Sequence, residues 1–285
     1  MSKFIACDSN YGDSSVVLFG APFDGTSSYR PGSRFASQDM RGDSFAIETF
    51  SPYQQKDLAD SNVYDAGDLE FPFGNTERVL DIIEDFTRNI LADGKVPVMI
   101  GGEHLVTLGA VRAVYAKYPG LSIVHFDAHA DMRDTYLSEK LSHATVMRRC
   151  ADLLGRERIF QFGIRSGERE EFAYSKANHF IITHTFNNIE KTAAALASAS
   201  IPVYLTIDLD VLDPAELPGT GTPEAGGVSF IELLAATLEV IATSNVVAID
   251  INELSPRLDT SGRSTSLANK FLRETLISIT LKEQQ

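Results

Sequence analysis

The segment Asp127–Asp131, with the sequence Asp-Ala-His-Ala-Asp, places two carboxylates and an imidazole at alternate positions of the chain. In an extended strand, alternate side chains point to the same side, so these three groups would converge. The largely apolar run Leu121–Phe126 directly before them predicts a buried strand. Because unpaired charges at the end of a buried strand are costly, a divalent cation is the expected partner. Mixed nitrogen and oxygen ligands suit Mn, Fe, Co or Zn.

Two further apolar runs end in residues of the same kinds. The run 203–207 leads into Asp208 and Asp210, and the run 96–100 leads into Gly-Gly-Glu-His, which ends at His104. Open parallel sheets place their sites at the carboxyl ends of strands. Together the three predicted strand ends offer six candidate metal ligands: His104, Asp127, His129, Asp131, Asp208 and Asp210. Six ligands exceed what one ion usually needs, and bridging carboxylates suit two ions roughly 3.5–4 Å apart.

Each of these residues also has a plainer interpretation. A single Asp after a strand is usually a cap or turn residue, and a single His is more often a hydrogen-bonded core group than a ligand. The coincidence of three such strand ends favours the metal site. His125 has the same strand parity as Asp127 but lies deeper in the apolar run, and we interpret it as a core histidine.

The elements that must position these residues follow from the hydrophobic pattern. Val79, Leu80, Ile83 and Phe86, for example, recur at helical spacing. The predicted strands are 15–19, 62–65, 96–100, 121–127, 159–163, 180–183, 203–208 and 246–251. The predicted helices are 76–94, 104–118, 142–154, 168–178, 188–199, 229–243 and 264–281. Apolar strands that alternate with helices predict a three-layer α/β/α sandwich with a mostly parallel sheet of about eight strands.

Two Gly/Pro-rich segments, 20–45 and 209–228, each follow a predicted strand and are interpreted as irregular functional loops. The second contains Pro-Gly-Thr-Gly-Thr-Pro at 218–223, which superficially suggests a phosphate-binding loop. It lacks the Lys-Ser/Thr ending of that loop and the spacing of the dinucleotide fingerprint. We therefore reject nucleotide binding.

Composition sets the broad limits. The chain has 285 residues, of which 44% are hydrophobic and 22% charged, with no linker or low-complexity stretch, so we expect a single domain over residues 1–285. The net charge of −14 argues against nucleic acid as a partner and is compatible with a cationic substrate. Cys7 and Cys150 form no Cys-x-x-Cys pattern. The polar N-terminus and the absence of long apolar runs predict no secretory signal and no membrane span, hence a cytoplasmic protein.

The three strand-end motifs resemble the signatures of one known family. Gly-Gly-Glu-His at 101–104, Asp-Ala-His-Ala-Asp at 127–131 and Thr-Ile-Asp-Leu-Asp-Val-Leu-Asp-Pro at 206–214 are similar to the three signatures of the arginase/agmatinase (ureohydrolase) family. Pro-Gly-Thr-Gly-Thr-Pro-Glu at 218–224 extends the third, and Tyr-Arg-Pro-Gly-Ser-Arg-Phe at 29–35 resembles the N-terminal loop of bacterial agmatinases. The resemblance covers nearly the whole chain and implies the arginase/deacetylase-like fold.

The resemblance implies two Mn²⁺ ions per chain with a bridging hydroxide. It assigns His104, Asp127, Asp131 and Asp208 to one ion, and Asp127, His129, Asp208 and Asp210 to the other. Metal coordination lowers the pKa of the shared water, and the resulting hydroxide attacks the guanidinium carbon to give urea and an amine.

Further residues match family positions that act on the substrate. Glu253 matches the glutamate that orients the guanidinium, since a carboxylate pairs with that group in fork geometry. His143 matches the histidine that carries a proton to the leaving amine. Thr222 matches a residue near the bound guanidinium. The resemblance thus implies catalytic roles for His143, Glu253 and the ligand Asp131, and substrate contacts for Glu253, Thr222 and His143.

The residues after the second motif bear on which guanidino compound is the substrate. Met132–Tyr136 lacks the Asn and the Ser/Thr-rich stretch with which arginases read an amino acid, and it resembles the agmatinase branch, whose substrate agmatine yields putrescine and urea. Asp134 or another loop acid is a candidate partner for the ammonium of agmatine. Arg133, if it pointed into the pocket, would instead favour an acidic compound such as guanidinobutyrate. Guanidinopropionate, formiminoglutamate and arginine remain alternatives.

Two other classes of function are weighed against this one. A metal-dependent deacetylase of related fold would use one Zn²⁺ beside an adjacent His-His pair, which this sequence lacks. A non-enzymatic metal-binding regulator would lack a catalytic group, whereas all the candidate groups are present. Family members form trimers or hexamers, so the resemblance implies a homo-oligomer as well.

Overall fold

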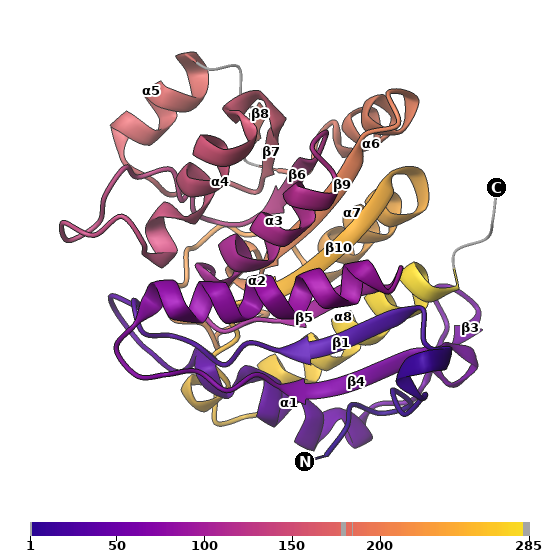
Figure 1. The fold of residues 1–285 in the computed structure, drawn as a ribbon. Helices are drawn as coiled ribbons and strands as arrows, with labels where there is room; N and C mark the ends of the chain where they lie inside the picture. Colours follow the sequence, from indigo (N-terminus) through magenta and orange to yellow (C-terminus); the bar gives the residue numbers. More distant parts are fainter. Residues whose placement is uncertain (1, 178–180, 184, 282–285) are drawn as a thin grey trace.

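A sheet of eight parallel strands runs through the centre of the protein (Figure 1). The computed structural model of the chain describes residues 2–177, 181–183 and 185–281. The strands lie in the order β4-β1-β5-β10-β9-β6-β7-β8, and every pairing among them is parallel. Their bounds are Val16–Gly20 for β1, Val63–Asp68 for β4, Val96–Ile100 for β5, Ser122–Phe126 for β6, Ile159–Phe162 for β7, Ile181–Thr183 for β8, Pro202–Asp208 for β9 and Asn245–Asn252 for β10.

Helices cover both faces of this sheet (Figure 1). One apolar core includes side chains of three helices: α2 (Thr76–Ala92), α3 (Val106–Lys117) and α4 (Val146–Leu154). Phe172 and Tyr174 of α5 (Arg169–Ala177) pack against the same core. The core on the opposite face includes side chains of α1 (Ala36–Asp43), α6 (Ile189–Ser198), α7 (Phe230–Thr243) and α8 (Arg263–Thr280).

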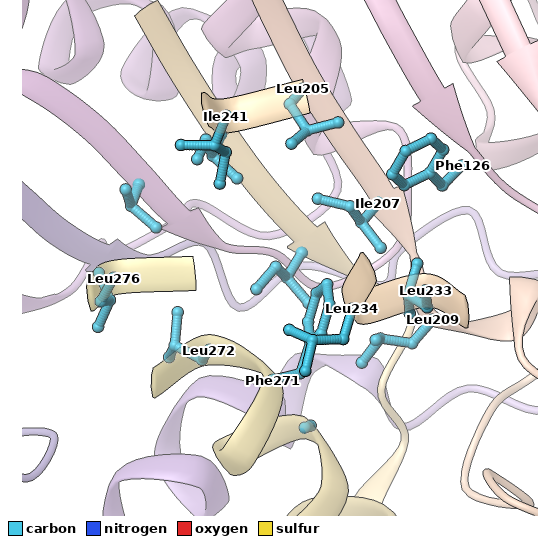
Figure 2. Packing of buried hydrophobic residues seen from close by; sticks show 14 of the residues in the cluster. Phe126, Leu205, Ile207, Leu209, Leu233, Leu234, Ile241, Phe271, Leu272 and Leu276 are labelled. Carbon is cyan, nitrogen blue, oxygen red and sulfur yellow. The ribbon is translucent and has the colours of Figure 1, made fainter. Parts of the chain in front are cut away.

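Strand β1 shows why the sheet is covered on both sides. Val16 and Leu18 belong to one core, whereas Val17 and Phe19 belong to the other, because successive side chains of a strand point to opposite faces. Both sets are apolar, as is typical of parallel sheets buried between helices. Figure 2 shows one of the two cores, in which strand side chains such as Ile207 pack against α7 and α8.

Four adjacent strands bring the candidate site residues to one edge of the sheet. β5, β10, β9 and β6 are neighbours and run in the same direction, so their carboxyl ends lie side by side. His104 follows β5, Glu253 follows β10, Asp208 ends β9 and Asp127 follows β6. This edge is where open α/β sheets place their sites.

The predicted fold class is confirmed, and all the strand pairings in the described part of this sheet are parallel. Each predicted strand and helix is present, with its ends shifted by a few residues. The predicted end of helix 168–178 and the predicted start of strand 180–183 lie outside the described residues. The interpretation of 20–45 as an irregular loop was wrong in part, because it contains α1. That helix buries only a few small or polar side chains besides Met40, so its sequence carries little apolar periodicity. The small hairpin of β2 (Phe50–Ser51) and β3 (Lys56–Asp57) was also not predicted.

Among the described residues, no helix combines the length and the apolar character that crossing a membrane would require.

Candidate active site

His104 lies at the centre of a cluster of buried carboxylates. Its side chain is 1% exposed, and it sits in the turn between β5 and α3. Its Nδ1 atom lies 3.0 Å from Asp127 Oδ2, 3.3 Å from Asp208 Oδ2 and 3.4 Å from Asp131 Oδ2. These are four of the six residues that the sequence proposed as metal ligands.

His129 forms a second group beside the first. Its Nδ1 atom lies 2.9 Å from Asp210 Oδ2 and 3.5 Å from Asp127 Oδ1. The two oxygens of Asp127 therefore face the two different histidines, His104 and His129. Among the described residues, Asp127 belongs to two groups whose ligand atoms lie close enough together to share an ion: one with His104 and His125, the other with His129 and Asp210. The structure thus gathers all six predicted ligands, with Asp127 between the two groups.

The convergence does not arise from an extended strand, and that part of the sequence argument was wrong. β6 ends at Phe126, so the segment that follows it is outside the sheet. Asp131 has a left-handed backbone with φ of 53°. Asp210 lies in the 3₁₀ turn Leu209–Val211, where its N–H donates to Asp208 Oδ1 at 2.8 Å. Tight turns at the strand ends, rather than strand alternation, direct these side chains inward.

A buried network fixes which nitrogen of His104 faces the carboxylates. Thr206 Oγ1 donates a hydrogen bond to the Asp250 carboxylate and lies 2.9 Å from His104 Nε2. Because its own proton goes to Asp250, the Thr206 hydroxyl accepts from His104 Nε2–H. The Nδ1 atom then presents its lone pair to the carboxylates, and it has no hydrogen-bond partner among the described residues. A buried imidazole lone pair among three carboxylates is the donor set of a divalent transition metal.

His125 is buried, as predicted, and it also has a role that the sequence did not reveal. Its Nε2 atom lies 2.8 Å from Asp127 Oδ2, and Gln161 Nε2 donates to its Nδ1 at 3.0 Å. Since Nδ1 accepts, Nε2 carries the proton and donates to Asp127. Burial lowers the pKa of His125, which keeps the imidazole neutral in this arrangement. His125 therefore orients the carboxylate that lies between the two groups.

Crowding of like charges and burial shift the pKa values of the residues in the cluster. Burial and the neighbouring Asp127 carboxylate raise the pKa of Asp131 to about 7. Burial, together with Asp210 and Asp127, raises the pKa of Asp208 well above its usual value. Burial opposes protonation of His104, but the adjacent carboxylates raise its pKa well above the usual value. Protons and metal ions compete for the same lone pairs, so these residues fit a cationic cofactor.

A cavity of about 540 Å³ opens beside the cluster. His104, His129, Asp131 and Asp208 reach its wall, and so do the predicted substrate residues His143, Thr222 and Glu253. Arg133, Glu171 and Glu224 also line it. The structure thus brings the proposed ligands and the proposed substrate contacts to the same space.

Glu253 joins the cavity to the ligand cluster. Its side chain is 7% exposed, and its Oε1 atom accepts a hydrogen bond from the His104 backbone N–H at 2.8 Å. Burial and the nearby Glu103 carboxyl raise the pKa of Glu253 well above its usual value. Its backbone, like that of Asp131, is left-handed, with φ of 64°. Such strained conformations of residues other than glycine concentrate at functional sites.

His143 approaches the cavity from the loop before α4. Its Nδ1 atom lies 3.0 Å from the Thr26 carbonyl oxygen, and its Nε2 atom lies 3.2 Å from Ser28 Oγ. The ring of Tyr136 meets the imidazole edge-on, with the ring centres 5.7 Å apart. Burial lowers the pKa of His143, so the free imidazole is favoured near neutral pH.

Two arginines, neither of which the sequence analysis singled out, organise the loop that follows β9. Arg165 donates to the backbone carbonyls of Asp210 and Glu224, each at 2.8 Å. Arg30 donates to the carbonyl of Thr220 at 2.7 Å. Thr222, held in this loop, donates to Asp210 Oδ2 at 3.3 Å. Arg30 lies in the segment 29–35 quoted above, but an arginine that ties distant loop carbonyls leaves no periodic sequence signal, which is why neither role was found.

Arg133 forms part of the cavity wall, but its positive charge is paired with two glutamates. Its Nη1 atom lies 3.0 Å from Glu168 Oε1, and its Nε atom lies 3.6 Å from Glu171 Oε2. Its guanidinium also lies over the ring of Tyr136, 4.8 Å from the ring centre. Asp134, considered as a partner for the substrate ammonium, instead accepts from Arg149 at 2.9 Å and is not part of the cavity wall.

Comparison with known proteins relates this arrangement to one family. The sequence model described as the arginase family matches residues 14–278. Agmatinase of Bacillus subtilis (strain 168) is 46% identical over 276 residues, which cover 96% of this chain and 95% of that protein. Agmatinase of Halalkalibacterium halodurans is 44% identical over 277 residues, with coverage of 96% and 95%. The solved structure of agmatine ureohydrolase of Thermoplasma volcanium has a TM-score of 0.89 and 36% identity, with coverage of 98% of this chain and 94% of that one.

Proposed function

Because this chain belongs to the arginase family, and is therefore a hydrolase of C–N bonds in guanidino compounds, we propose that its substrate is agmatine. The products are then putrescine and urea. The proposal includes two Mn²⁺ ions, held by His104, Asp127, His129, Asp131, Asp208 and Asp210. It also includes a single catalytic domain over residues 1–285 and assembly of the chain into a homo-oligomer.

The observation that carries the proposal is the position of Glu253. One of its carboxylate oxygens is anchored by the His104 N–H, and the same side chain lines the cavity beside the ligand cluster. A buried carboxylate recognises a guanidinium through charge-assisted hydrogen bonds. A guanidinium held by Glu253 lies next to the ligand cluster, where its central carbon is open to attack by water.

Each group then has a defined task. A bound metal pair supplies Lewis acidity and a water of lowered pKa. Glu253 orients the guanidinium and balances its charge. His143, which is partly buried beside the cavity, provides a nitrogen that exchanges a proton with the departing amine. Thr222, through its bond to Asp210, holds the loop that closes the cavity beside the guanidinium.

The charges around the rest of the cavity support a substrate with a second cationic group. Arg133 is paired with Glu168 and Glu171, so it presents little free positive charge. Glu224 lines the cavity with a half-exposed carboxylate that accepts from Ser166 Oγ at 2.9 Å. Glu224, in addition to the two acids that pair with Arg133, favours the terminal ammonium of agmatine over the carboxylate of guanidinobutyrate.

The test is a measurement of urea release with added Mn²⁺ from agmatine, guanidinobutyrate, guanidinopropionate, formiminoglutamate and arginine. Agmatine is expected to give the highest kcat/KM. A higher kcat/KM with guanidinobutyrate would overturn the substrate assignment, and Arg133 would then be the group to which that preference is traced. Metal analysis of the same preparation distinguishes two bound ions from one.

The variant Glu253→Gln tests the proposed role of Glu253 in the mechanism. The amide keeps the size of the side chain and one acceptor oxygen but loses the charge that pairs with a guanidinium. Urea release is expected to fall at least a hundredfold, while the bound metal content stays the same. Unchanged turnover would remove Glu253 from the mechanism.

A further inference from the structure

Glu103 is a buried acid directly before His104, outside the set of proposed ligands. Its side chain is fully buried, and its carboxylate accepts three hydrogen bonds from the loop after β1. The donors are the Thr26 backbone N–H at 2.8 Å, the Thr26 hydroxyl, and the Ser27 hydroxyl at 3.3 Å. The Glu103 N–H in turn donates to the Phe23 carbonyl at 2.7 Å. This acid therefore fixes the loop to the end of β5.

Thr26 connects this anchored loop to His143 through two contacts. The His143 backbone N–H donates to Thr26 Oγ1 at 3.0 Å, and His143 Nδ1 lies 3.0 Å from the Thr26 carbonyl oxygen. The Thr26 hydroxyl donates a hydrogen bond to Glu103 Oε1, so its lone pair is directed to the His143 N–H. Backbone and imidazole of His143 are thus both held by one residue.

The contact to the carbonyl determines the tautomer of the neutral imidazole. A carbonyl oxygen only accepts hydrogen bonds, so His143 Nδ1 carries the proton. The other nitrogen, Nε2, then has a lone pair beside Ser28 Oγ, in the wall of the cavity. Ser142 Oγ lies 3.3 Å from Nδ1 and is the group that competes with the Thr26 carbonyl.

We propose that Glu103 and Thr26 are positioning residues that hold His143 in the Nδ1–H tautomer, so that Nε2 is the nitrogen that exchanges the proton. The proposal deepens the role of His143 and rests on the proposed function. In the chemical step, the C–N bond to the leaving amine breaks and its electron pair stays on the amine nitrogen. That nitrogen takes from Nε2 the proton that the imidazole accepted from the attacking water, and the imidazole returns to the neutral Nδ1–H form.

The test compares Thr26→Val with Thr26→Ser. Thr26→Ser removes the methyl group and keeps the hydroxyl that links Glu103 to the His143 N–H. Thr26→Val keeps the shape of the side chain but replaces that hydroxyl by a methyl group. The tautomer is read from the ¹⁵N shifts of the two ring nitrogens in ¹⁵N-histidine-labelled, full-length protein that carries Zn²⁺ as a diamagnetic ion. The His143 signals are assigned by their absence from His143→Gln.

Wild type and Thr26→Ser are expected to show Nδ1 as the protonated nitrogen. Thr26→Val keeps the backbone carbonyl but loses the hydroxyl links to Glu103 and to the His143 N–H that hold this carbonyl against Nδ1. Ser142 can then donate to Nδ1 instead, so a substantial share of the Nε2–H tautomer is expected. With agmatine, kcat of Thr26→Val should fall about tenfold, because part of the proton-transfer contribution is lost, while KM changes less. Thr26→Ser should stay within about threefold of wild type in kcat.

Glu103→Gln gives a second route to the same result. One amide oxygen cannot serve all three donors of the loop, so the tautomer ratio should shift in the same direction as in Thr26→Val. If both Thr26→Val and Glu103→Gln keep the wild-type ¹⁵N pattern, the positioning role is wrong. The NMR measurement needs no turnover, so it tests the positioning role independently of the substrate. If agmatine is not the substrate, wild type will release no urea from it, whatever the ¹⁵N shifts show.

Discussion

Arg133 Nη1 lies 3.0 Å from Glu168 Oε1, at the rim of the cavity that holds the candidate ligands. The sequence places Arg133 two residues after the second motif, Asp127–Asp131, but says nothing of Glu168, which lies just before α5. The pair decides whether the mouth of the cavity presents a free positive charge. Since Glu171 also faces Arg133, the local charge is negative, as a substrate with a terminal ammonium requires.

Removing the charge of Glu168 should change substrate preference. In Glu168→Gln, Arg133 loses its shorter ion pair and keeps the longer one with Glu171, so the positive charge at the cavity rim is less balanced. The ratio of kcat/KM for agmatine to that for guanidinobutyrate is expected to fall about threefold, because partly exposed ion pairs are worth roughly 0.2–1 kcal/mol. Urea release from both compounds measures the ratio. The control is Glu170→Gln, because Glu170 is exposed and lies on α5 two residues after Glu168. An equal fall of the kcat/KM ratio in that variant would assign the effect to net charge alone.

The hydroxyl of Thr206 should contribute to metal affinity. In Thr206→Val, His104 Nε2–H loses its acceptor, so the imidazole is no longer held with Nδ1 toward the carboxylates. Loss of such a partner typically weakens metal binding 10- to 100-fold, and a fall of about tenfold in Mn²⁺ affinity is expected by calorimetry.

A matched control for that variant is Thr237→Val on α7. Thr237 is also fully buried, but its hydroxyl has no hydrogen-bond partner among the described residues. This variant removes the same atoms far from the ligand cluster and should leave Mn²⁺ affinity unchanged. Equal losses of affinity in both variants would contradict the role of Thr206.

Metal removal should lower thermal stability as well as activity. The buried carboxylates of Asp127, Asp131, Asp208 and Asp210 repel one another unless a cation or protons compensate. Ligand binding at about 100 times Kd stabilises by roughly 2.7 kcal/mol, which corresponds to a Tm lower by about 5 °C after chelation. Differential scanning fluorimetry with EDTA, followed by re-addition of Mn²⁺, measures the shift. The Tm of Asp210→Asn should respond less, and a wild-type Tm indifferent to EDTA would speak against these ligands.

Asp259 should stabilise the start of α8 in a pH-dependent manner. Its Oδ2 atom accepts from the Ser264 N–H at 2.9 Å, and its Oδ1 atom accepts from the Ser261 N–H at 3.0 Å. Partial burial opposes ionisation, but these bonds and those from the two hydroxyls hold the pKa of Asp259 below its usual value. A carboxyl whose pKa is depressed in the folded protein stabilises above its unfolded pKa of about 3.9, and the contribution is lost as pH falls through the folded pKa.

Asp259→Asn is therefore expected to lower the free energy of unfolding by about 1 kcal/mol at neutral pH, as is typical when a side chain that accepts from a first-turn N–H of a helix is replaced. The difference from wild type should narrow below about pH 4. Urea denaturation at several pH values measures both effects. Asp43→Asn serves as control, since Asp43 is exposed and its carboxylate has no hydrogen-bond partner within the described part of the chain. A difference that grows on acidification would mean that the sign of the pKa shift is wrong.

The sequence by itself determined the fold class and the membership of the cluster. Both depend on local information: apolar runs of strand length, helical periodicity, and acids or histidines directly after the strands. Since parallel strands end at one edge of a sheet, residues such as His104 and Asp208 could be assigned to one site before their distances were known. Asp131 was assigned correctly to the cluster but for the wrong geometric reason, because a turn with a left-handed backbone directs it inward.

Only the tertiary structure decided the contacts between segments that are distant in sequence. Glu103 reaches Thr26 across 77 residues, Thr26 reaches His143 across 117, and Arg133 meets Glu168 on a different element. The side chains of these residues have no periodicity, and a polar residue in a loop has the same sequence signature whether it is solvated or buried. Their partners are fixed by the order of the strands and by the packing of the loops that follow them. The identity of the reacting groups was therefore local information, whereas their orientation and charge balance were not.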